Sequence, residues 1–286
     1  MKVTVFGATG VVGRALLPLL GEHEVTAVSR SSREDAGARW VVADAATGDG
    51  VAEALVGAEV AYYLVHSLGS RDFEEQDRAA AEAVAREAAS AGVRQIVYLG
   101  GLGADDPDAS AHLRSRRETG ERLGSAGVPV TTLRAAMIVG RGSAAFETIL
   151  GLVKRLPVMI TPTWVSTPTQ PIALDDIATY LAGGRGNQAA LGESFDVGGP
   201  EVMTYRQMIE RIARLLGRTP AILEVPVLTP YLSSLWLNLV TPVNASVARP
   251  LIEGLRNPTI AREERIRELV LLNLTPFDEA ARLALS

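Results

Sequence analysis

The chain has 286 residues, of which 47% are hydrophobic and 21% are charged, and this composition indicates a globular protein. It contains no cysteine, which excludes disulfides, thiolate catalysis and cysteine-ligated metals, and with only three histidines we predict no metal site. The net charge of −5 disfavours binding to nucleic acid. The first ten residues, MKVTVFGATG, do not resemble a signal peptide, which favours a cytoplasmic protein.

The first half of the chain alternates short β-branched runs with helical stretches, which is typical of parallel βαβ units. The runs are mostly apolar throughout, as expected of strands covered by helices on both faces. We predict strands at Val3–Phe6, Val25–Val28, Trp40–Val42, Val60–Val65, Gln95–Leu99 and Val130–Leu133. The sequence therefore predicts an α/β fold.

Three helices are expected between these strands. The first begins near Gly10 and carries Pro18, which should kink or shorten it. The second, Phe73–Ala91, has acidic residues at its start and Gly92 just past its end, in agreement with helix polarity and C-capping. The third covers Ser110–Ser125.

Beyond residue 140, helical pieces alternate with short strands and many prolines. The expected helices are Ala145–Arg155, Leu174–Ala182 and Tyr205–Leu216. We interpret Asp175 and Asp176 as the N-terminal cap of the second of these helices. The segments Leu156–Leu174 and Val225–Ala248 carry no charge and contain Trp164 and Trp236, which we interpret as core anchors. Prolines interrupt the second segment, so we predict no integral membrane span. A core or a pocket wall is favoured, and docking on a membrane or a partner stays open.

A glycine-rich turn follows the first strand and opens the first helix: Gly7-Ala8-Thr9-Gly10-Val11-Val12-Gly13. In such a turn the first glycine permits the tight bend, the second lets the backbone approach a pyrophosphate, and the third lets helix and strand pack closely. The helix N-terminus then presents free N–H groups to the anion. The strand–turn–helix context predicts a dinucleotide-binding site.

The choice of cofactor is read at the end of the second strand, where an acidic residue would bind a ribose 2′-hydroxyl. Here the chain has Ser29, Arg30, Ser31 and Arg33, with no acid before Glu34. An arginine at this place can pair with a 2′-phosphate, so NADP(H) is favoured over NAD(H); the alternative is that both arginines are solvated loop charges.

Further cofactor contacts are expected at the carboxyl ends of the third and fourth strands, where ligands gather in such sheets. Asp44 is placed to accept a hydrogen bond from an adenine amino group. Leu64, Val65 and His66 should lie along the adenosine ribose and approach the nicotinamide.

With these residues, the chain resembles the atypical or extended short-chain dehydrogenases/reductases, and within them the NmrA-like NAD(P)H-binding subgroup and its bacterial YbjT-like proteins. The resemblance extends over nearly the whole chain, through YYLVHSLGSRDFEEQDRAAAEAVAREA, HLRSRRETGERL, VPVTTLRAAMIVGRGSAAFE, TQPIALDDIATYLA, FDVGGPEVMTYRQMIERIARLLG and VTPVNASVARPLIEGLRN.

The resemblance implies a Rossmann fold, a doubly wound parallel sheet with strand order 3-2-1-4-5-6, and a small C-terminal substrate lobe. We assign residues 1–155 to the NAD(P)-binding core and residues 156–286 to a mixed α/β region that contributes to the sheet and forms the lobe. The resemblance further implies that Arg134, Ala135 and Ile138 lie beside the nicotinamide.

The residues that carry the chemistry in this family are missing. Typical members use a tyrosine, a lysine four residues later and a nearby serine, and the lysine lowers the pKa of the phenol. No tyrosine of this chain has a lysine at that distance, and His112 and Arg116 stand at the two positions. The serine is replaced by the run Leu99–Gly103, which carries no hydroxyl.

Other groups would have to replace this chemistry. A histidine can transfer protons near pH 7, so His112 and His66 are candidate proton donors, and Arg116 could hold a ribose hydroxyl. The alternative for each histidine is a hydrogen-bonded structural residue.

Two functions follow from the sequence. The first is an NADPH-dependent oxidoreductase acting on a small apolar carbonyl, enone or quinone-like compound. The second is a non-catalytic NADP(H)-binding redox sensor or scaffold, in which partner affinity changes with the state of the nicotinamide. The chain is expected to be a monomer or a homodimer.

Overall fold

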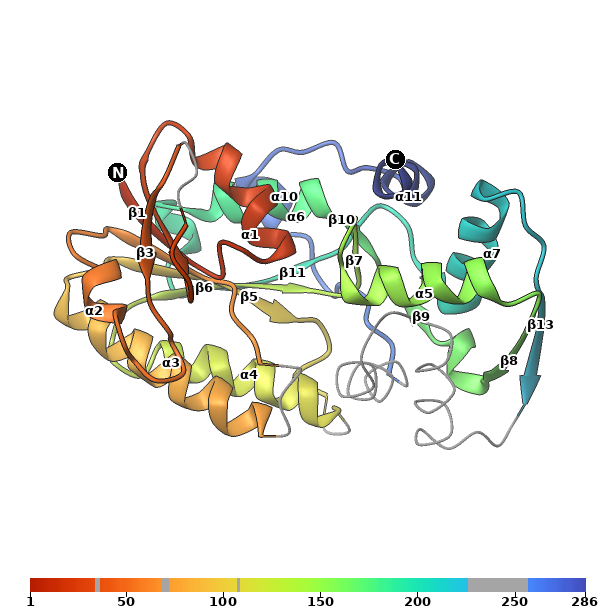
Figure 1. Ribbon diagram of the computed structural model, residues 1–286, viewed down its shortest axis with the longest axis horizontal. Coiled ribbons are helices and arrows are strands. Elements are labelled where there is room, and N and C mark those ends of the chain that lie inside the picture. Colours follow the sequence, from red (N-terminus) through yellow and green to blue (C-terminus); the bar gives the residue numbers. More distant parts are fainter. Residues whose placement is uncertain (34–36, 68–71, 107–108, 226–256) are drawn as a thin grey trace.

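The computed structural model describes residues 1–33, 37–67, 72–106, 109–225 and 257–286 (Figure 1). Trp236 and nearly all of the second charge-free segment therefore lie outside the described residues. In the part that is described, no helix is both long enough and apolar enough to cross a membrane.

A parallel seven-stranded sheet forms the centre of the N-terminal half. Its strands lie in the order β11-β6-β5-β4-β1-β2-β3, and every pair of neighbours is parallel. The strands are β1 (Lys2–Phe6), β2 (Glu24–Ser29), β3 (Arg39–Val42), β4 (Val60–Tyr63), β5 (Gln95–Gly101), β6 (Val130–Ala135) and β11 (Ser194–Val197). This order confirms the expected 3-2-1-4-5-6 arrangement of a doubly wound sheet and adds β11 beside β6.

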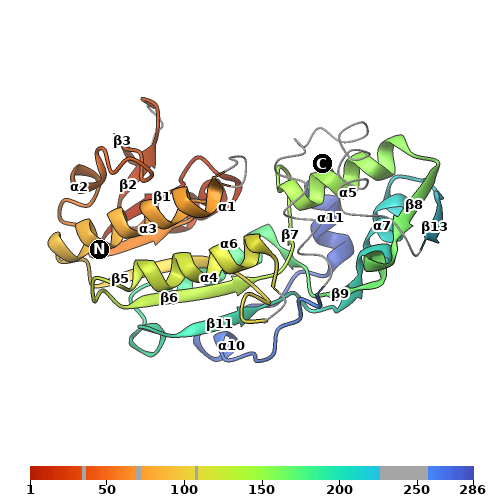
Figure 2. The ribbon, with the colours of Figure 1, turned by 90° about the horizontal axis from the view of Figure 1, so that it is seen from below.

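Helices cover both faces of the sheet, which explains why its strands are apolar throughout (Figures 1 and 2). One face carries α1 (Val11–Leu16), the 3-10 helix η1 (Leu17–Leu20), α6 (Leu174–Gly184) and α10 (Ile266–Leu269). The other face carries α2 (Val51–Ala54), α3 (Phe73–Ser90) and α4 (Ala111–Leu123). As predicted from Pro18, the α-helical part of the first helix is short and continues as η1.

A second hydrophobic core lies in a lobe beside the carboxyl edge of the sheet (Figures 1 and 2). The lobe contains α5 (Ala144–Arg155), β8 (Val158–Pro162), η2 (Thr163–Ser166), β9 (Pro168–Thr169), β12 (Met203–Thr204), α7 (Tyr205–Leu215), β13 (Ala221–Val225) and α11 (Phe277–Leu285). Two short strands, β7 (Ile138–Val139) and β10 (Ile172–Ala173), pair where the chain passes between sheet and lobe, and η3 (Gln188–Ala190) precedes β11.

The chain crosses between the two regions several times. After α5 and the first lobe strands it returns to the sheet through α6 and β11, and it later contributes α10 there. The boundary at residue 155 proposed from the sequence falls at the end of α5, a helix whose buried side chains belong to the lobe core rather than to the sheet.

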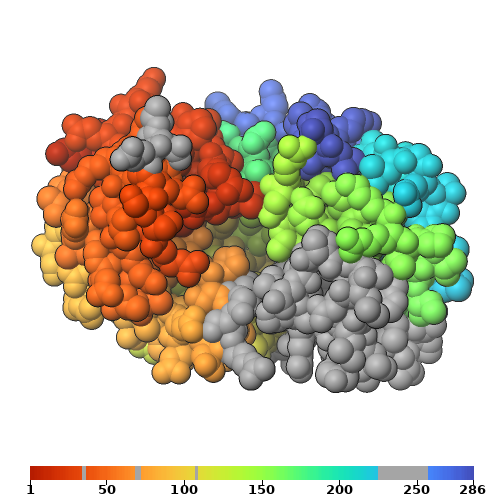
Figure 3. All heavy atoms as spheres, viewed as in Figure 1, coloured from red at the N-terminus to blue at the C-terminus, as the bar shows by residue number. Residues whose placement is uncertain are grey.

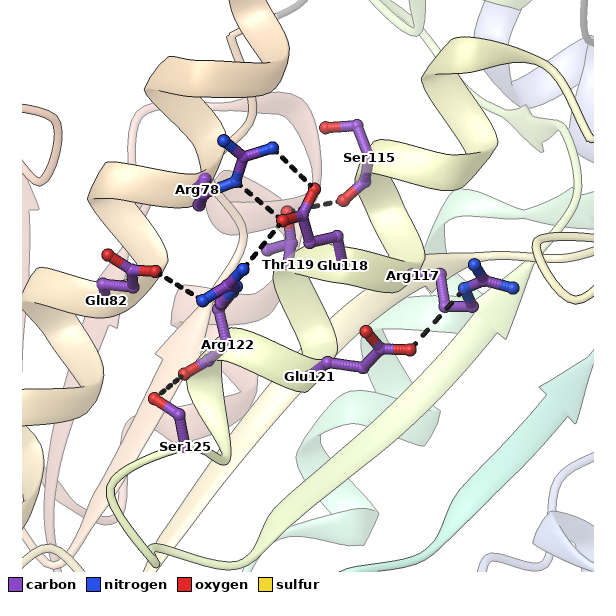
Figure 4. A network of polar contacts seen from close by, with 9 residues as sticks. All are labelled: Arg78, Glu82, Ser115, Arg117, Glu118, Thr119, Glu121, Arg122 and Ser125. Atoms are coloured by element: carbon purple, nitrogen blue, oxygen red, sulfur yellow. Dashed lines mark hydrogen bonds and ion pairs between the residues drawn. The ribbon is translucent and has the colours of Figure 1, made fainter.

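The outer surfaces of α3 and α4 are joined by ion pairs (Figure 4). Arg78 binds both carboxylate oxygens of Glu118, at 2.7 and 3.2 Å. Arg122 contacts Glu82 at 2.9 Å and Glu118 at 3.3 Å. These exposed pairs align the two helices within one chain, although pairs of this kind contribute little to stability.

The interpretation of Asp175 and Asp176 as a helix cap was wrong. The N-cap of α6 is Ala173, and both aspartates lie in the first turn. Asp176 is buried and accepts hydrogen bonds from the backbone N–H and the hydroxyl of Thr275, at 2.8 and 2.9 Å. A buried carboxylate needs such partners, so Asp176 fastens the segment before α11 to α6.

Candidate functional site

A cavity of about 400 Å³ lies between the carboxyl edge of the sheet and the lobe. Its walls come from the glycine loop (residues 7–13), the ends of β4, β5 and β6, the start of α4, the start of α5, and two residues of the lobe side, Tyr205 and Thr259. Figure 3 shows the hollow between the N-terminal segment and the lobe. This volume is in the range of small-molecule sites.

Two glycines of the loop are required by the protein itself. Gly7 has φ +85°, and a Cβ there would lie 2.9 Å from the backbone of Leu64. A Cβ on Gly13 would lie 2.3 Å from the carbonyl oxygen of Gly7 and 2.7 Å from Cα of Ala8. The first glycine therefore makes the turn and the third allows the helix to approach the strand, as the motif requires.

Gly10 differs from its two neighbours in the motif. Its φ is −71°, which any residue adopts, and its nearest obstacle to a Cβ is the Gly7 carbonyl oxygen at 3.2 Å. The residue is exposed and lines the cavity. Since the protein restricts this position only mildly, a close-lying ligand is the better reason for the glycine, and the loop fits a dinucleotide diphosphate.

The end of β2 carries the residues that were predicted to select the cofactor. Ser29 is buried and its hydroxyl accepts a hydrogen bond from the N–H of Ser31 at 3.3 Å. The guanidinium of Arg33 lies 5.9 Å from the ring centre of Trp40, an arrangement typical of a cation–π contact. Arg30 is exposed and, within the described residues, pairs with no acid. Its guanidinium is thus available for an anion.

Asp44 follows β3 and is half-buried. One carboxylate oxygen accepts a hydrogen bond from the N–H of Ala46 at 2.9 Å, which stabilises the turn after the strand. Its role toward adenine stays a prediction.

The two candidate histidines lie together on the cavity wall. The rings of His66 and His112 are 6.4 Å apart and arranged edge to face. Desolvation by the surrounding protein, assisted by the charge of Arg116, lowers the pKa of His66 to about 4 and that of His112 to about 3. His66 is exposed and His112 is half-buried, so both imidazoles keep water-accessible surface along the cavity. With these lowered pKa values both are uncharged at neutral pH.

The carboxylate of Asp77 holds the segment that carries His66, a role that the sequence analysis missed. It is buried, and it accepts hydrogen bonds from the N–H of Ser67 at 2.8 Å and from the hydroxyl of Ser115 at 3.4 Å. The loop after β4 and helix α4 are thereby joined behind the cavity wall.

Arg116 is buried, and its guanidinium already has partners. It donates hydrogen bonds to the carbonyl oxygens of Leu99 and Val65, and it lies 4.9 Å from the ring centre of Tyr98. Arg116 therefore ties the carboxyl ends of β4 and β5 to α4. It also lines the cavity, and its contact with a ribose stays a prediction.

The residues expected after β6 separate into two groups. Ala135 and Ile138 line the cavity of the glycine loop. Arg134, on the alternate side of the strand, faces a different cavity and pairs with Asp105 at 2.5 Å and Asp196 at 2.7 Å. The placement of Arg134 beside the nicotinamide is thus not supported, because side chains alternate along a strand.

Tyr205 and Thr259 on the lobe wall, and Arg14 beside the glycine loop, were also missed. Arg14 donates to the carbonyl oxygen of Thr9 at 2.6 Å, and its position one residue after Gly13 was the available signal. No local pattern marks Tyr205 and Thr259 as a pair, since they are far apart in the sequence. Among the described residues, no group of three histidines or acids could hold a metal ion.

Comparison with known proteins agrees with this geometry. Residues 7–138, which include the glycine loop and β2 to β6, match the model of a family described as NAD(P)H-binding. The match supports nicotinamide nucleotide binding by this part of the chain.

Two curated proteins are similar in sequence. One is a (4-alkanoyl-5-oxo-2,5-dihydrofuran-3-yl)methyl phosphate reductase of Streptomyces griseus, 28% identical over 76% of this chain and 74% of its own length. The other is the mitochondrial NADH dehydrogenase [ubiquinone] 1 alpha subcomplex subunit 9 of Arabidopsis thaliana, 22% identical over 78% of this chain. The aligned part spans 60% of the plant subunit.

A solved structure of an NADPH-dependent quinone oxidoreductase from Escherichia coli, in complex with NADPH, superposes with a TM-score of 0.77. The superposition covers 100% of both chains at 18% sequence identity, so it shows a common fold. The chain thus has the fold of Rossmann-type NAD(P)-binding proteins, and its residues 7–138 match an NAD(P)H-binding family.

Proposed function

We propose that the protein is an NADPH-dependent reductase of a small apolar carbonyl, enone or quinone-like compound. The observation that carries the proposal is the cavity that extends from Gly7 and Gly10 past the ends of β4 and β5 to Met137 and the lobe. Such a cavity offers a diphosphate site at one end and a largely apolar chamber at the other. Bound NADPH would supply a hydride there.

The protein's part in cofactor binding follows from the loop and from β2. The amides at the start of α1 face the diphosphate, and Gly10 leaves room for its approach. Arg30 pairs with the 2′-phosphate, which gives the preference for NADP(H) over NAD(H). Asp44, Leu64 and Val65 lie toward the adenosine.

The chemistry of the substrate class is suggested by the relatives. The Streptomyces protein is named as the reductase of a methyl phosphate that carries an oxo- and alkanoyl-substituted dihydrofuran ring, and the Escherichia coli protein as a quinone oxidoreductase. Compounds of both kinds carry carbonyl oxygens on a small ring. A largely apolar cavity wall that includes Leu102 and Met137 suits such rings.

His112 would contact the reacting group as a neutral imidazole. Because its pKa is lowered to about 3, an imidazolium acid is not present at pH 7, whereas a neutral imidazole still donates a hydrogen bond. His66 would contribute in the same way from the neighbouring wall, since its pKa is also lowered.

The proposal is tested by NADPH oxidation, followed at 340 nm, with a panel of quinones, cyclic enones and small aromatic aldehydes. We expect consumption with at least one carbonyl compound and a lower rate in His112→Ala. A full rate in His112→Ala would remove the role of that residue. NADPH binding without consumption on the whole panel would contradict a reductase.

A second candidate function is a non-catalytic NADP(H)-dependent sensor or scaffold. It is favoured by the uncharged histidines and by Arg116, two of whose N–H groups already donate to backbone carbonyls. The similarity to a plant NADH dehydrogenase subunit points in the same direction. This candidate predicts a partner whose affinity differs between the NADP⁺ and NADPH complexes, and equal affinities would contradict it.

A further inference from the structure

A cluster of three hydroxyl groups lies at the lobe end of the cavity. The hydroxyls of Thr169 and Thr259 are 2.6 Å apart. The phenol of Tyr205 lies beside the side chains of both threonines, whose hydroxyls offset part of the rise that burial causes in its pKa. Thr169 is fully buried, and Tyr205 and Thr259 are at least nine-tenths buried, yet these two residues line the cavity.

Three separate segments bring these hydroxyls together. Thr169 ends β9, which pairs with β12, and Tyr205 follows β12 as the first residue of α7. Thr259 joins from the far side through a bridge to Thr169, and its N–H donates to Pro168 at 3.2 Å. The ring of Tyr205 is further held by Trp164, whose ring lies 6.1 Å away in an edge contact. The position of the phenol is therefore fixed by packing.

The three hydroxyls of this cluster can be arranged so that one O–H is left for a ligand. Each hydroxyl has a single O–H, so a closed ring of three bonds uses every donor. If the ring opens at Tyr205, Thr259 donates to Thr169 and Thr169 donates to the phenol oxygen, while the phenol O–H can turn to a ligand. A hydroxyl chain of this kind strengthens its last donor. Burial raises the pKa of Tyr205, so the phenol keeps its proton at neutral pH.

We propose that the Tyr205 hydroxyl, supported by Thr169 and Thr259, donates the hydrogen bond that holds the carbonyl oxygen of a flat apolar ligand in this cavity. The ligand class is a ring ketone or quinone, because the site offers one donor within largely apolar walls. Thr259 also lies beside the β5–α4 connection, where a Cβ on Gly103 would be 3.5 Å from its methyl group. Tyr205, Thr259 and His112 thus line the same cavity. This inference rests on the proposed function and names the group that recognises its substrate.

The test compares two flat probes of the same ring system. Menadione (2-methyl-1,4-naphthoquinone) carries carbonyl oxygens, and 2-methylnaphthalene carries none. Because the chain has no cysteine, the quinone cannot form thiol adducts with it. Dissociation constants are measured by equilibrium dialysis on the cofactor-free protein and on the NADP⁺ complex, neither of which can reduce the quinone.

We expect Tyr205→Phe to weaken menadione binding about fivefold to tenfold, the effect of one lost hydrogen bond, and to leave 2-methylnaphthalene binding unchanged. Thr259→Val should weaken menadione binding less, since it removes only the support. Tyr62→Phe is the control, because the hydroxyl of Tyr62 donates to Leu181 at 3.1 Å and does not line the cavity. Thermal unfolding of each variant reports whether it folds.

The inference is overturned if Tyr205→Phe and the wild type bind menadione equally, or if this variant loses affinity for both probes together. Should Tyr205→Phe fail to fold, Thr259→Val decides by the same comparison of probes. The proposed function fails separately, when neither NADPH nor NADH binds. A Tyr205-dependent preference for menadione in the cofactor-free protein would then still support this inference.

Discussion

The two walls of the cavity differ in the kind of atoms they present. The sheet wall, built from the glycine loop and the ends of β1 and β4, presents backbone atoms and tolerates almost no side chain at Gly7 and Gly13. The lobe wall presents the side chains of Tyr205 and Thr259, from segments that are distant in the sequence, and the buried hydroxyl of Thr169 lies behind them. We propose that the first wall binds the diphosphate of the cofactor and that the second wall distinguishes between substrates.

The largest effect on stability is expected from a substitution that adds atoms to the tightly packed glycine loop of the sheet wall. Gly13→Ala places a methyl group 2.3 Å from the carbonyl oxygen of Gly7, so helix and strand must move apart. We expect a loss of about 1–3 kcal/mol in the free energy of unfolding, measured by urea denaturation. A variant as stable as the wild type would show that the strand and helix pack less closely than described.

Arg30→Ala tests whether this arginine gives the preference for NADPH over NADH. Loss of a charge-assisted contact to the 2′-phosphate should weaken NADPH binding about tenfold and leave NADH binding unchanged. Arg33→Ala is a matched control, because the side chain of Arg33 lies against Trp40. Equal losses for both nucleotides in Arg30→Ala would refute the phosphate contact.

The histidines between the two walls make the stability of the folded protein depend on pH. An unfolded histidine has a pKa of 6.5, whereas that of His112 is lowered to about 3 by burial and by Arg116. Between these pH values the unfolded state binds more protons, so stability is present above pH 6.5 and falls as the pH decreases toward 3.

We therefore expect the melting temperature of His112→Asn to decrease less steeply than that of the wild type over this range. His66, whose pKa is also lowered, is exposed, so we expect it to contribute less than His112. Identical slopes for variant and wild type would show that the imidazole of His112 is solvated when the protein is folded.

The smallest effect is expected outside both walls. Arg78→Ala removes the contact with Glu118 on the surface of α3 and α4 (Figure 4). Exposed ion pairs contribute little, so the melting temperature and the nucleotide affinity should both stay within error of the wild type. A clear loss of nucleotide affinity would mean that the ion pairs between α3 and α4 influence the geometry of the cavity.

The sheet wall could be predicted from the sequence because its determinants are local. Each predicted strand of the sheet is found within about two residues of its bounds, and the spacing of Gly7, Gly10 and Gly13 is the pattern that a dinucleotide-binding turn carries. The order of the strands followed from the resemblance to a known family.

The lobe wall and the partners of Arg116 could not be predicted, because they depend on long-range contacts. Thr169 and Thr259 are 90 residues apart, and Arg116 reaches Val65 across 51 residues. The cap at Asp175 and Asp176 was misassigned because acidic residues are as common in the first turn as at the N-cap, and only the backbone angles distinguish the two.

The most direct test of the central claim is a calorimetric titration of NADPH into the wild type and into Gly10→Ala. A Cβ at this position meets only the Gly7 carbonyl oxygen at 3.2 Å, so the fold should persist while the space for a diphosphate is reduced. We predict saturable binding to the wild type and at least about tenfold weaker binding to Gly10→Ala, at similar melting temperatures. No heat from NADPH or NADH with the wild type, or equal affinity in Gly10→Ala, would contradict the account.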